Sequence, residues 1–247
     1  MSAVASRRLT LRNQGEAYGI AVVCRAQHLV ATLGGRFSLE LDIDVDRGAD
    51  EIERWALAAT LFGNRISTSV ALRTYRVLEH AGVRTIADAG GRNWEELVAL
   101  LDEGGYVRYD ERTASRLLAL AEAIADRYDG RLATLGEQLV DAGELERALD
   151  ALPGWGPVTV RAFLRELRGV WPGADVMLDQ RAAAAARHLQ LPTGLEALNS
   201  LAAVARLDLR DLEAGLVRLG LCHDLAKCPG GEECPFAAVD RARVVHD

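Results

Sequence analysis

The sequence predicts an all-α protein, and three observations support that class. Apolar residues recur at helical spacing through most of the 247 residues, and Gly or Pro residues separate the periodic stretches. Only residues 37–43 alternate between apolar and polar side chains, as a short extended segment does. No repeat or low-complexity linker divides the chain. We therefore expect helices joined by short connections.

The bounds of the expected helices follow from start and stop signals. The first helix covers residues 14–33, because the pair Gly34-Gly35 ends its periodicity. Asp50 is a capping residue for the second helix, which runs to Phe62 and is broken by Gly63. The remaining helices are expected at residues 67–81, 93–102, 110–128, 143–152, 158–168, 179–188, 195–205 and 208–219.

The composition indicates a soluble globular protein without a membrane-spanning segment. Hydrophobic residues make up 49% of the chain and charged residues 26%, and charges interrupt even the Ala-rich stretches. The arginines near the N-terminus have no apolar stretch behind them, so no secretory signal is expected and the cytoplasm is the expected compartment. The net charge of −7 counts against nucleic acid as a partner, although a local basic face can act on an acidic protein.

The most informative segment lies between Leu149 and Val160. An amphipathic helix is expected to end at Leu152, and a Pro-Gly-Trp-Gly turn then precedes the next helix. Gly154 and Gly156 let this turn adopt positive φ, and they leave the amide groups at the start of the next helix uncovered. Such amides form a site suited to phosphate. The alternative is an ordinary αα-hairpin without a ligand.

The segment Leu152-Pro-Gly-Trp-Gly156 resembles the LPG-x-G hairpin of the helix–hairpin–helix (HhH-GPD) DNA glycosylases, typified by endonuclease III. In that family a Gly/Pro-rich loop and an essential Asp follow the hairpin, and Trp171-Pro-Gly-Ala-Asp-Val-Met-Leu-Asp179 supplies both here. Arg187 matches an arginine of the following helix. Residues 61–70 and 104–114 resemble two further segments of the family, so the resemblance runs in order from about residue 50 to residue 236.

This resemblance implies a two-lobed helical fold with a cysteine-containing C-terminal loop. A six-helix, barrel-like lobe that includes the hairpin would cover residues 47–170, and residues 1–46 and 171–247 would form the second lobe. Double-stranded DNA would bind across the cleft between the lobes. The implied protein is a monomer that works in the nucleoid.

Asp179 is the carboxylate that the resemblance makes essential. Cleavage of an N-glycosidic bond develops positive charge on the sugar, and a nearby carboxylate stabilises that charge. A carboxylate can also orient or deprotonate the attacking water, and the target nucleotide must leave the base stack to reach it. Two alternatives stay open: Asp179 only caps the helix that follows it, or Asp175 is the carboxylate that acts.

The single lysine of the chain restricts the chemistry. Bifunctional members of the family use a lysine after the hairpin, whose neutral amine forms a Schiff base that leads to strand cleavage. Val158 occupies that position here, and Lys227 lies in the cysteine-rich tail. The sequence therefore predicts a monofunctional DNA N-glycosylase without efficient AP-lyase activity.

Candidate DNA contacts come from the hairpin and from two other segments. Asn64 aligns with a Gln that fills the gap left by the flipped base, and Arg65 could contribute; the alternative is a turn with a solvated arginine. Tyr106 and Tyr109 could wall the base pocket, or they could pack in the core. Trp155 could contact the DNA backbone or brace the helices. The candidate contacts in the hairpin are Gly154, Trp155, Gly156, Val158 and Thr159.

Three of the four cysteines crowd into the C-terminal tail as Cys222-x5-Cys228-x5-Cys234. Endonuclease III relatives carry C-x6-C-x2-C-x5-C around a [4Fe–4S] cluster, so the last interval fits and one ligand position is absent. Cys24 could be a fourth ligand, or His223 could complete a Cys3His zinc site. A metal-free loop is the third alternative. In each case the role is structural.

The expected function is hydrolysis of the bond between the sugar and a damaged or mispaired base in double-stranded DNA. Alkylated, deaminated, oxidised and mismatched bases all fit. One rival is a catalytically silent helix–hairpin–helix protein that recognises DNA structure, and another is an all-α interaction protein that does not bind DNA. Salt-dependent binding of duplex DNA separates the last from the other two. In the first two, the C-terminal loop would present Arg241 and Arg243 to phosphate.

Overall fold

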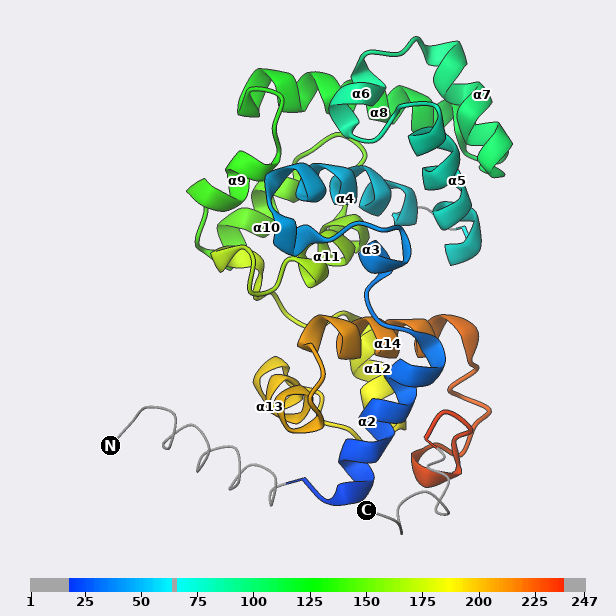
Figure 1. Ribbon diagram of the computed structural model, residues 1–247, viewed down its shortest axis with the longest axis vertical. Helices are drawn as coiled ribbons and strands as arrows, with labels where there is room; N and C mark the ends of the chain where they lie inside the picture. The colour runs from blue at the N-terminus through cyan, green and yellow to red at the C-terminus, as the bar shows by residue number, and fades with distance from the viewer. Residues whose placement is uncertain (1–17, 64–65, 238–247) are drawn as a thin grey trace. The chain divides into compact units, whose positions relative to one another are not determined.

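The computed structural model describes residues 18–63 and 66–237, and every regular element in these two stretches is helical. The predicted all-α class is therefore confirmed. The chain divides into two compact units: a central unit, Phe37–Val176, and a terminal unit, which consists of Met1–Arg36 and Met177–Asp247 (Figure 1). Residues 37–46 and 171–176, which the sequence assigns to the second lobe, thus belong to the central unit. No helix within the described residues combines the length and the apolar character needed to cross a bilayer.

The central unit contains both halves of the predicted hairpin. Its elements are α3 (Phe37–Glu40), η1 (Val45–Arg47), α4 (Ala49–Phe62), α5 (Thr68–His80), α6 (Ile86–Gly90), α7 (Trp94–Gly104), α8 (Asp110–Tyr128), α9 (Ala133–Gln138), α10 (Ala142–Asp150), α11 (Pro157–Glu166) and η2 (Pro172–Ala174).

Helix α4 forms the core of the central unit. Its sequence ADEIERWALAATLF is apolar around most of its circumference, so neighbours can bury it on several sides. It contacts α5, α6, α9 and α11, and Trp55, Leu57 and Leu61 are fully buried. The Trp55 indole donates a hydrogen bond to the Phe163 carbonyl at 3.2 Å, which ties α4 to α11. The second hairpin helix is therefore anchored on the most buried element of the unit.

Side-chain caps define several helix starts in the central unit. The Asn93 side chain accepts the Glu96 N–H at 2.8 Å, and the Glu96 carboxylate accepts the Asn93 N–H at 3.4 Å, so the two form a capping box before α7. The Ser67 hydroxyl caps α5 by accepting the Val70 N–H at 3.3 Å. Gly48, and not the predicted Asp50, is the N-cap of α4; Asp50 lies in its first turn, where a negative charge complements the helix dipole.

The prediction of an extended segment at residues 37–43 is wrong, because the first four of these residues form helix α3. The N–H groups of Phe37 and Ser38 each donate to the buried Glu166 carboxylate at 2.8 Å. A helix start needs acceptors for its first N–H groups, and here a carboxylate distant in the sequence supplies them. Burial does not follow the alternating pattern either, because Ser38 is fully buried and Leu39 is exposed.

The terminal unit packs around its last α-helix, Leu209–Cys222. Its elements are α2 (Ile20–Leu33), α12 (Gln180–His188), α13 (Leu195–Ala205), α14 (Leu209–Cys222) and η3 (Gly231–Glu233). Helix α14 contacts α2, α12 and α13, and its Leu212, Leu216 and Leu219 are fully buried. Buried Ala182 and Ala185 on α12 allow the close approach of α14. This packing fixes the ends of α12 and α14, from which two candidate metal ligands extend.

Candidate functional site

Helices α10 and α11 form the predicted hairpin (Figure 1). The Leu152 carbonyl accepts the Trp155 N–H at 3.1 Å and closes the turn between them. Gly154 has a φ of +79°, a left-handed conformation that favours glycine. The Arg116 side chain packs against it, because a Cβ added to Gly154 would lie 3.1 Å from the Arg116 Cβ. The turn therefore requires glycine at position 154 for two independent reasons, and Arg116 is a cation beside the turn that the sequence analysis missed.

The N-terminus of α11 is uncovered. Gly156 is its N-cap, with an extended φ of −151° and open space around the position of an added Cβ. Pro157 has no N–H, and the first hydrogen bond of the helix runs from the Val160 N–H to the Gly156 carbonyl at 3.0 Å. The amides of Val158 and Thr159 thus precede the helical ladder and can be presented to an anion.

Trp155 braces the hairpin and is not exposed at its tip. Its side chain is buried, its indole N–H donates to the Thr60 hydroxyl at 2.9 Å, and its ring meets the Phe163 ring edge-on at 5.1 Å between centroids. Thr60 lies on α4 and Phe163 on α11. The structure thus places Trp155 in the bracing position that was the alternative to a contact with the DNA backbone.

The two other side chains predicted to contact DNA from α11 differ in exposure. Val158 is 53% exposed, whereas Thr159 is buried against Gly63, so that a Cβ added to Gly63 would overlap the Thr159 hydroxyl. The Thr159 side chain is therefore not available to a ligand. Asn64 and Arg65 lie outside the described residues, but Gly63, which precedes them, contacts α11.

The two candidate base-pocket tyrosines occupy different environments. Tyr106 is 1% exposed, and its hydroxyl donates to the Leu61 carbonyl. It therefore occupies the core position that was the alternative to a pocket wall. Tyr109 is half-buried, and the Arg112 guanidinium lies 5.9 Å from the centre of its ring.

Buried Arg168 organises the loop that follows the hairpin. Its guanidinium donates to the carbonyls of Val176 at 2.8 Å and Ala174 at 3.3 Å, and it lies 3.9 Å from the exposed carboxylate of Asp175. A guanidinium can satisfy several acceptors of an irregular loop at once, because its donors point in fixed directions. Sequence analysis missed this residue, since an arginine at the end of a helix gives no local sign that it will be buried.

Asp179 begins helix α12 in the terminal unit. Its Oδ1 accepts the Arg181 N–H at 2.7 Å, and its own N–H donates to the Glu213 carboxylate at 3.4 Å. The side chain is half-buried. One carboxylate oxygen thus caps the helix, as one alternative supposed, and this fixes the orientation of the other oxygen. Arg187, at the opposite end of α12, is exposed.

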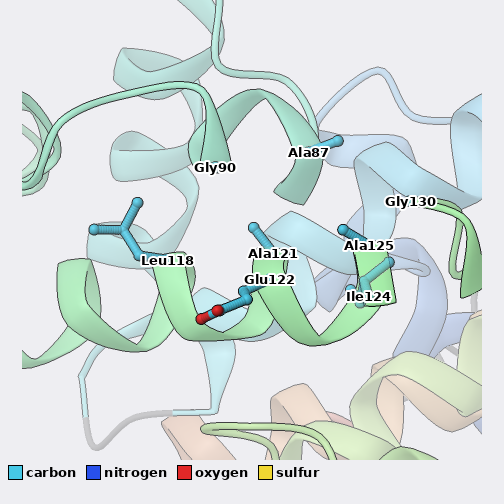
Figure 2. Close-up of a pocket in the computed structure, with 8 residues that line it drawn as sticks. All are labelled: Ala87, Gly90, Leu118, Ala121, Glu122, Ile124, Ala125 and Gly130. Atoms are coloured by element: carbon cyan, nitrogen blue, oxygen red, sulfur yellow. The ribbon is translucent and has the colours of Figure 1, made fainter. Parts of the chain in front are cut away.

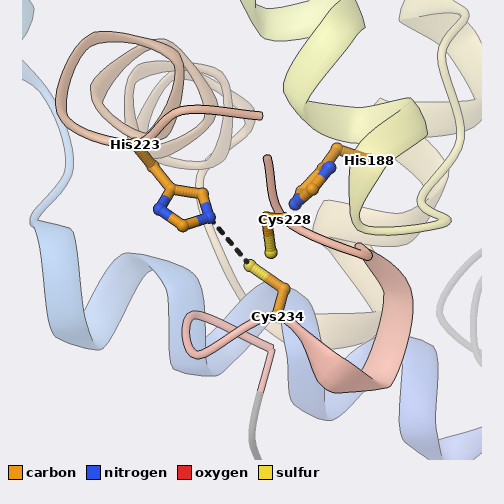
Figure 3. A group of neighbouring side chains, drawn as sticks. All are labelled: His188, His223, Cys228 and Cys234. Atoms are coloured by element: carbon orange, nitrogen blue, oxygen red, sulfur yellow. Dashed lines mark hydrogen bonds between the residues drawn. The ribbon is translucent and has the colours of Figure 1, made fainter. Parts of the chain in front are cut away.

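Four potential metal ligands come together in the terminal unit (Figure 3). His188 lies in the last turn of α12, His223 directly follows α14, and Cys228 and Cys234 belong to the loop after α14. Each offers one ligand atom, and all four atoms lie within 4.8 Å of one another. His223 Nε2 and Cys234 Sγ are 3.9 Å apart. This cluster could hold a metal ion.

The cluster differs from the predicted ligand set. It includes His223, Cys228 and Cys234, but Cys24 and Cys222 lie outside it. Cys222 is the last residue of α14; its side chain is exposed, and its Sγ lies 3.9 Å from the Leu219 carbonyl. The next residue, His223, places its side chain in the cluster instead. His188 was missed, since it lies far from the tail in the sequence and only the packing of α12 on α14 brings it there.

The surroundings of the cluster affect its proton equilibria. Burial raises the pKa of the Cys234 thiol, and the neighbouring Cys228 acts in the same direction, whereas the backbone N–H of Phe236 stabilises the thiolate. Burial lowers the pKa of His188, and the adjacent His223 lowers it further. The His188 imidazole is thereby held in the neutral form that binds metals.

Two surface pockets of the central unit lie away from these groups. One, of about 300 Å³, lies where α6 packs on α8 and is lined mainly by small apolar residues together with Glu122 (Figure 2). The other, of about 310 Å³, has a charged lining that includes Asp50, Arg54 and Arg131. Neither contains the hairpin, so neither corresponds to the predicted site.

A comparison with protein-family models finds no match for this chain, and a comparison with curated proteins finds none either.

Proposed function

We propose that this chain is a monofunctional DNA glycosylase that hydrolyses the bond between deoxyribose and an altered or mispaired base in duplex DNA. The proposal rests on one succession of features: a hairpin whose second helix begins with uncovered amides, followed 23 residues after Gly156 by the helix-capping Asp179. The sequence of this stretch resembles the helix–hairpin–helix glycosylases. The local geometry is compatible with the roles that the resemblance assigns.

The hairpin binds the DNA backbone in this proposal. The amides of Val158 and Thr159 meet a phosphate at the positive end of the α11 dipole, with no side chain on Gly156 to block it. Arg116, packed against Gly154, adds positive charge beside the turn. Trp155 holds the turn on α4 and leaves base recognition to other residues.

Asp179 acts on the glycosidic bond. A water oxygen adds to C1′ of the sugar while the bond from C1′ to the base nitrogen breaks, and the base leaves with the electron pair. The carboxylate stabilises the positive charge on the sugar and takes the proton from the water; the departing base takes up a proton from solvent. Because Oδ1 is engaged by the Arg181 N–H, the carboxylate is oriented before substrate arrives.

The same proposal excludes Schiff-base chemistry at the hairpin. The exposed residues at the start of α11 are Pro157 and Val158, and neither side chain carries a nucleophile. Lys227 belongs to the terminal unit, where its ammonium lies 2.8 Å from the Asp224 carboxylate. The expected product is therefore an abasic site with an intact strand.

A panel of duplex oligonucleotides tests the proposal, each carrying one lesion or mismatch from the alkylated, deaminated, oxidised and mispaired classes. Wild type, Asp179→Asn and Asp175→Asn are incubated with each duplex, and half of every sample is treated with hot alkali. Asn is as good an N-cap as Asp, so Asp179→Asn keeps the helix start and removes the charge. Asp175→Asn is the matched control, because it removes an exposed carboxylate from the same loop.

Breaks that need alkali, vanish in Asp179→Asn and persist in Asp175→Asn would support the proposal and name the substrate. Breaks without alkali would contradict the monofunctional assignment. No breaks on any duplex, with binding that weakens steeply as salt rises, would replace the enzyme with a non-catalytic DNA-binding protein. No binding at low salt would overturn both.

A further inference from the structure

We propose that His188, His223, Cys228 and Cys234 bind a single structural Zn²⁺ ion that fastens the C-terminal loop to the ends of α12 and α14. The inference rests on the local geometry of the terminal unit and is independent of the proposed action on DNA. It assigns a ligand set that differs from the three-cysteine tail suggested by the sequence.

The separations of the ligand atoms fit one tetrahedral ion. Zn–N and Zn–S bonds of about 2.0 and 2.3 Å at tetrahedral angles place ligand atoms about 3.3–3.8 Å apart. The four atoms already lie within 4.8 Å of one another, and the His223–Cys234 pair is at 3.9 Å. Side-chain shifts of about 1 Å therefore complete the site without backbone rearrangement. Figure 3 shows the four side chains converging from three segments of the chain.

An unpaired buried nitrogen supports a ligand at this point. His188 Nε2 is buried and has no hydrogen-bond partner among the described residues. A buried polar atom without a partner costs about 1–3 kcal/mol, so such atoms are rare unless a water or an ion satisfies them. The other ring nitrogen lies against the loop, since a Cβ added to Gly230 would approach His188 Nδ1 to 3.2 Å. Nε2 is thus the atom that the fold leaves for the metal.

The loop itself is shaped for close approach to His188. Gly230 has a φ of +79°, and a Cβ there would lie 2.8 Å from the His188 carbonyl oxygen. The adjacent Gly231 also has a positive φ, of +57°, and an added Cβ would meet the Gln190 amide at 2.7 Å. Two consecutive glycines therefore let the loop carry Cys228 and Cys234 over the end of α12.

The donor set favours zinc over an iron–sulfur cluster. Two imidazoles and two thiolates form one of the closed tetrahedral sets of structural zinc sites, and they leave no coordination position for substrate. In a [4Fe–4S] cluster each ligand binds a different iron, so the four ligand atoms must lie around a body of eight atoms and not around one ion. Ligand atoms all within 4.8 Å of one another, two of them nitrogens, do not fit that arrangement.

Metal analysis of protein produced without a histidine tag tests the proposal. The wild type is purified under reducing conditions, and its zinc, iron and acid-labile sulfide are measured per chain. Cobalt replacement provides a second readout, because tetrahedral Co²⁺ with two thiolates gives intense visible bands and thiolate charge-transfer absorption. His188→Ala and Cys228→Ser remove predicted ligands. Cys222→Ser, Cys24→Ser and His28→Ala are matched controls that remove the same side-chain types outside the cluster.

The expected result is about one zinc per chain in the wild type and the controls. At least a tenfold loss of zinc affinity is expected in the two ligand variants, whose helix content is checked by circular dichroism. Loss of zinc in Cys222→Ser but not in His188→Ala would overturn the ligand assignment. Stoichiometric iron and sulfide would overturn zinc, as would a Cys228–Cys234 disulfide in protein that has no affinity for zinc or cobalt after reduction.

Discussion

The indole N–H of Trp155 donates to the Thr60 hydroxyl at 2.9 Å, and both side chains are buried. The same hydroxyl donates to the Ala56 carbonyl one turn earlier on α4, at 2.8 Å. Thr60 therefore acts as donor to its own helix and acceptor from the hairpin. The turn at the start of α11 is thus held by a polar contact inside an apolar core, where losing one partner leaves the other unsatisfied.

Thr60→Val keeps the shape of the side chain and removes this acceptor. The buried indole N–H is left without its partner, so we expect a loss of about 1–3 kcal/mol in the free energy of unfolding. Urea denaturation of the wild type and the variant measures the loss. Thr60→Ser is the control, because it keeps the hydroxyl; equal stability of all three proteins would show that the hydrogen bond does not stabilise the fold.

The two hairpin glycines offer a matched comparison. Gly154→Ala places a side chain at a φ of +79° and against Arg116, so we expect a cost of about 1–2 kcal/mol from the backbone alone. Gly156→Ala adds a Cβ in open space at an extended φ, where any residue is allowed, so its stability changes little. Thermal unfolding of both variants checks the difference. The prediction fails if the substitution at position 156 is the more damaging one.

Long periodic segments were predictable from the sequence because their signals are local. The bounds expected for α8 and α13 match the structure at both ends. These helices have 19 and 11 residues, and an amphipathic pattern of that length is a strong signal for a helix. Helix α6, of five residues, is too short for periodicity to show. Its capping box between Thr85 and Asp88 was nevertheless a local signal that could have revealed it.

Features that depend on tertiary contacts were not predictable. Residues 37–40 are helical because Glu166, far along the chain, accepts their first N–H groups. His188 joins the cysteine tail only through the packing of α12 on α14. The choice of His223 over Cys222 depends on which of two adjacent side chains turns inward at the end of α14. Spacing in the sequence found the region of the cluster and candidates that include Cys228, Cys234 and His223, but it did not find His188.

Removal of the proposed metal should weaken the terminal unit. A ligand that binds only the folded state stabilises it by an amount that grows with the logarithm of its free concentration relative to its Kd. A strong chelator lowers the free zinc concentration, so it should lower the melting temperature of the wild type. The effect should be absent in His188→Ala and undiminished in Cys222→Ser. Differential scanning calorimetry with and without the chelator measures both shifts. A wild type unaffected by a chelator that has demonstrably removed its zinc would contradict a structural role for the ion.

Glu53 gives the central unit a pH dependence whose sign can be worked out. Burial is the largest influence on the pKa of this carboxyl and raises it above the ordinary 4.5. The hydrogen bond from the Ala133 N–H, at 2.7 Å, and the positive charge of Arg131 lower the pKa, but by less. Between pH 4.5 and its raised pKa, the folded chain keeps a proton that the unfolded chain has released. Its contribution to stability is therefore full below pH 4.5 and declines as pH rises through the raised pKa.

Glu53→Gln isolates this contribution. The amide keeps an oxygen that can accept the Ala133 N–H and stays neutral at every pH, so it does not lose stability as pH rises. We expect the free energy of unfolding of the variant, relative to the wild type, to increase from about pH 4 toward neutrality. Urea denaturation of both proteins across this range measures the difference, in which the other carboxylates cancel. A difference that stays constant or decreases with pH would mean that the carboxyl is ionised in the folded core without penalty.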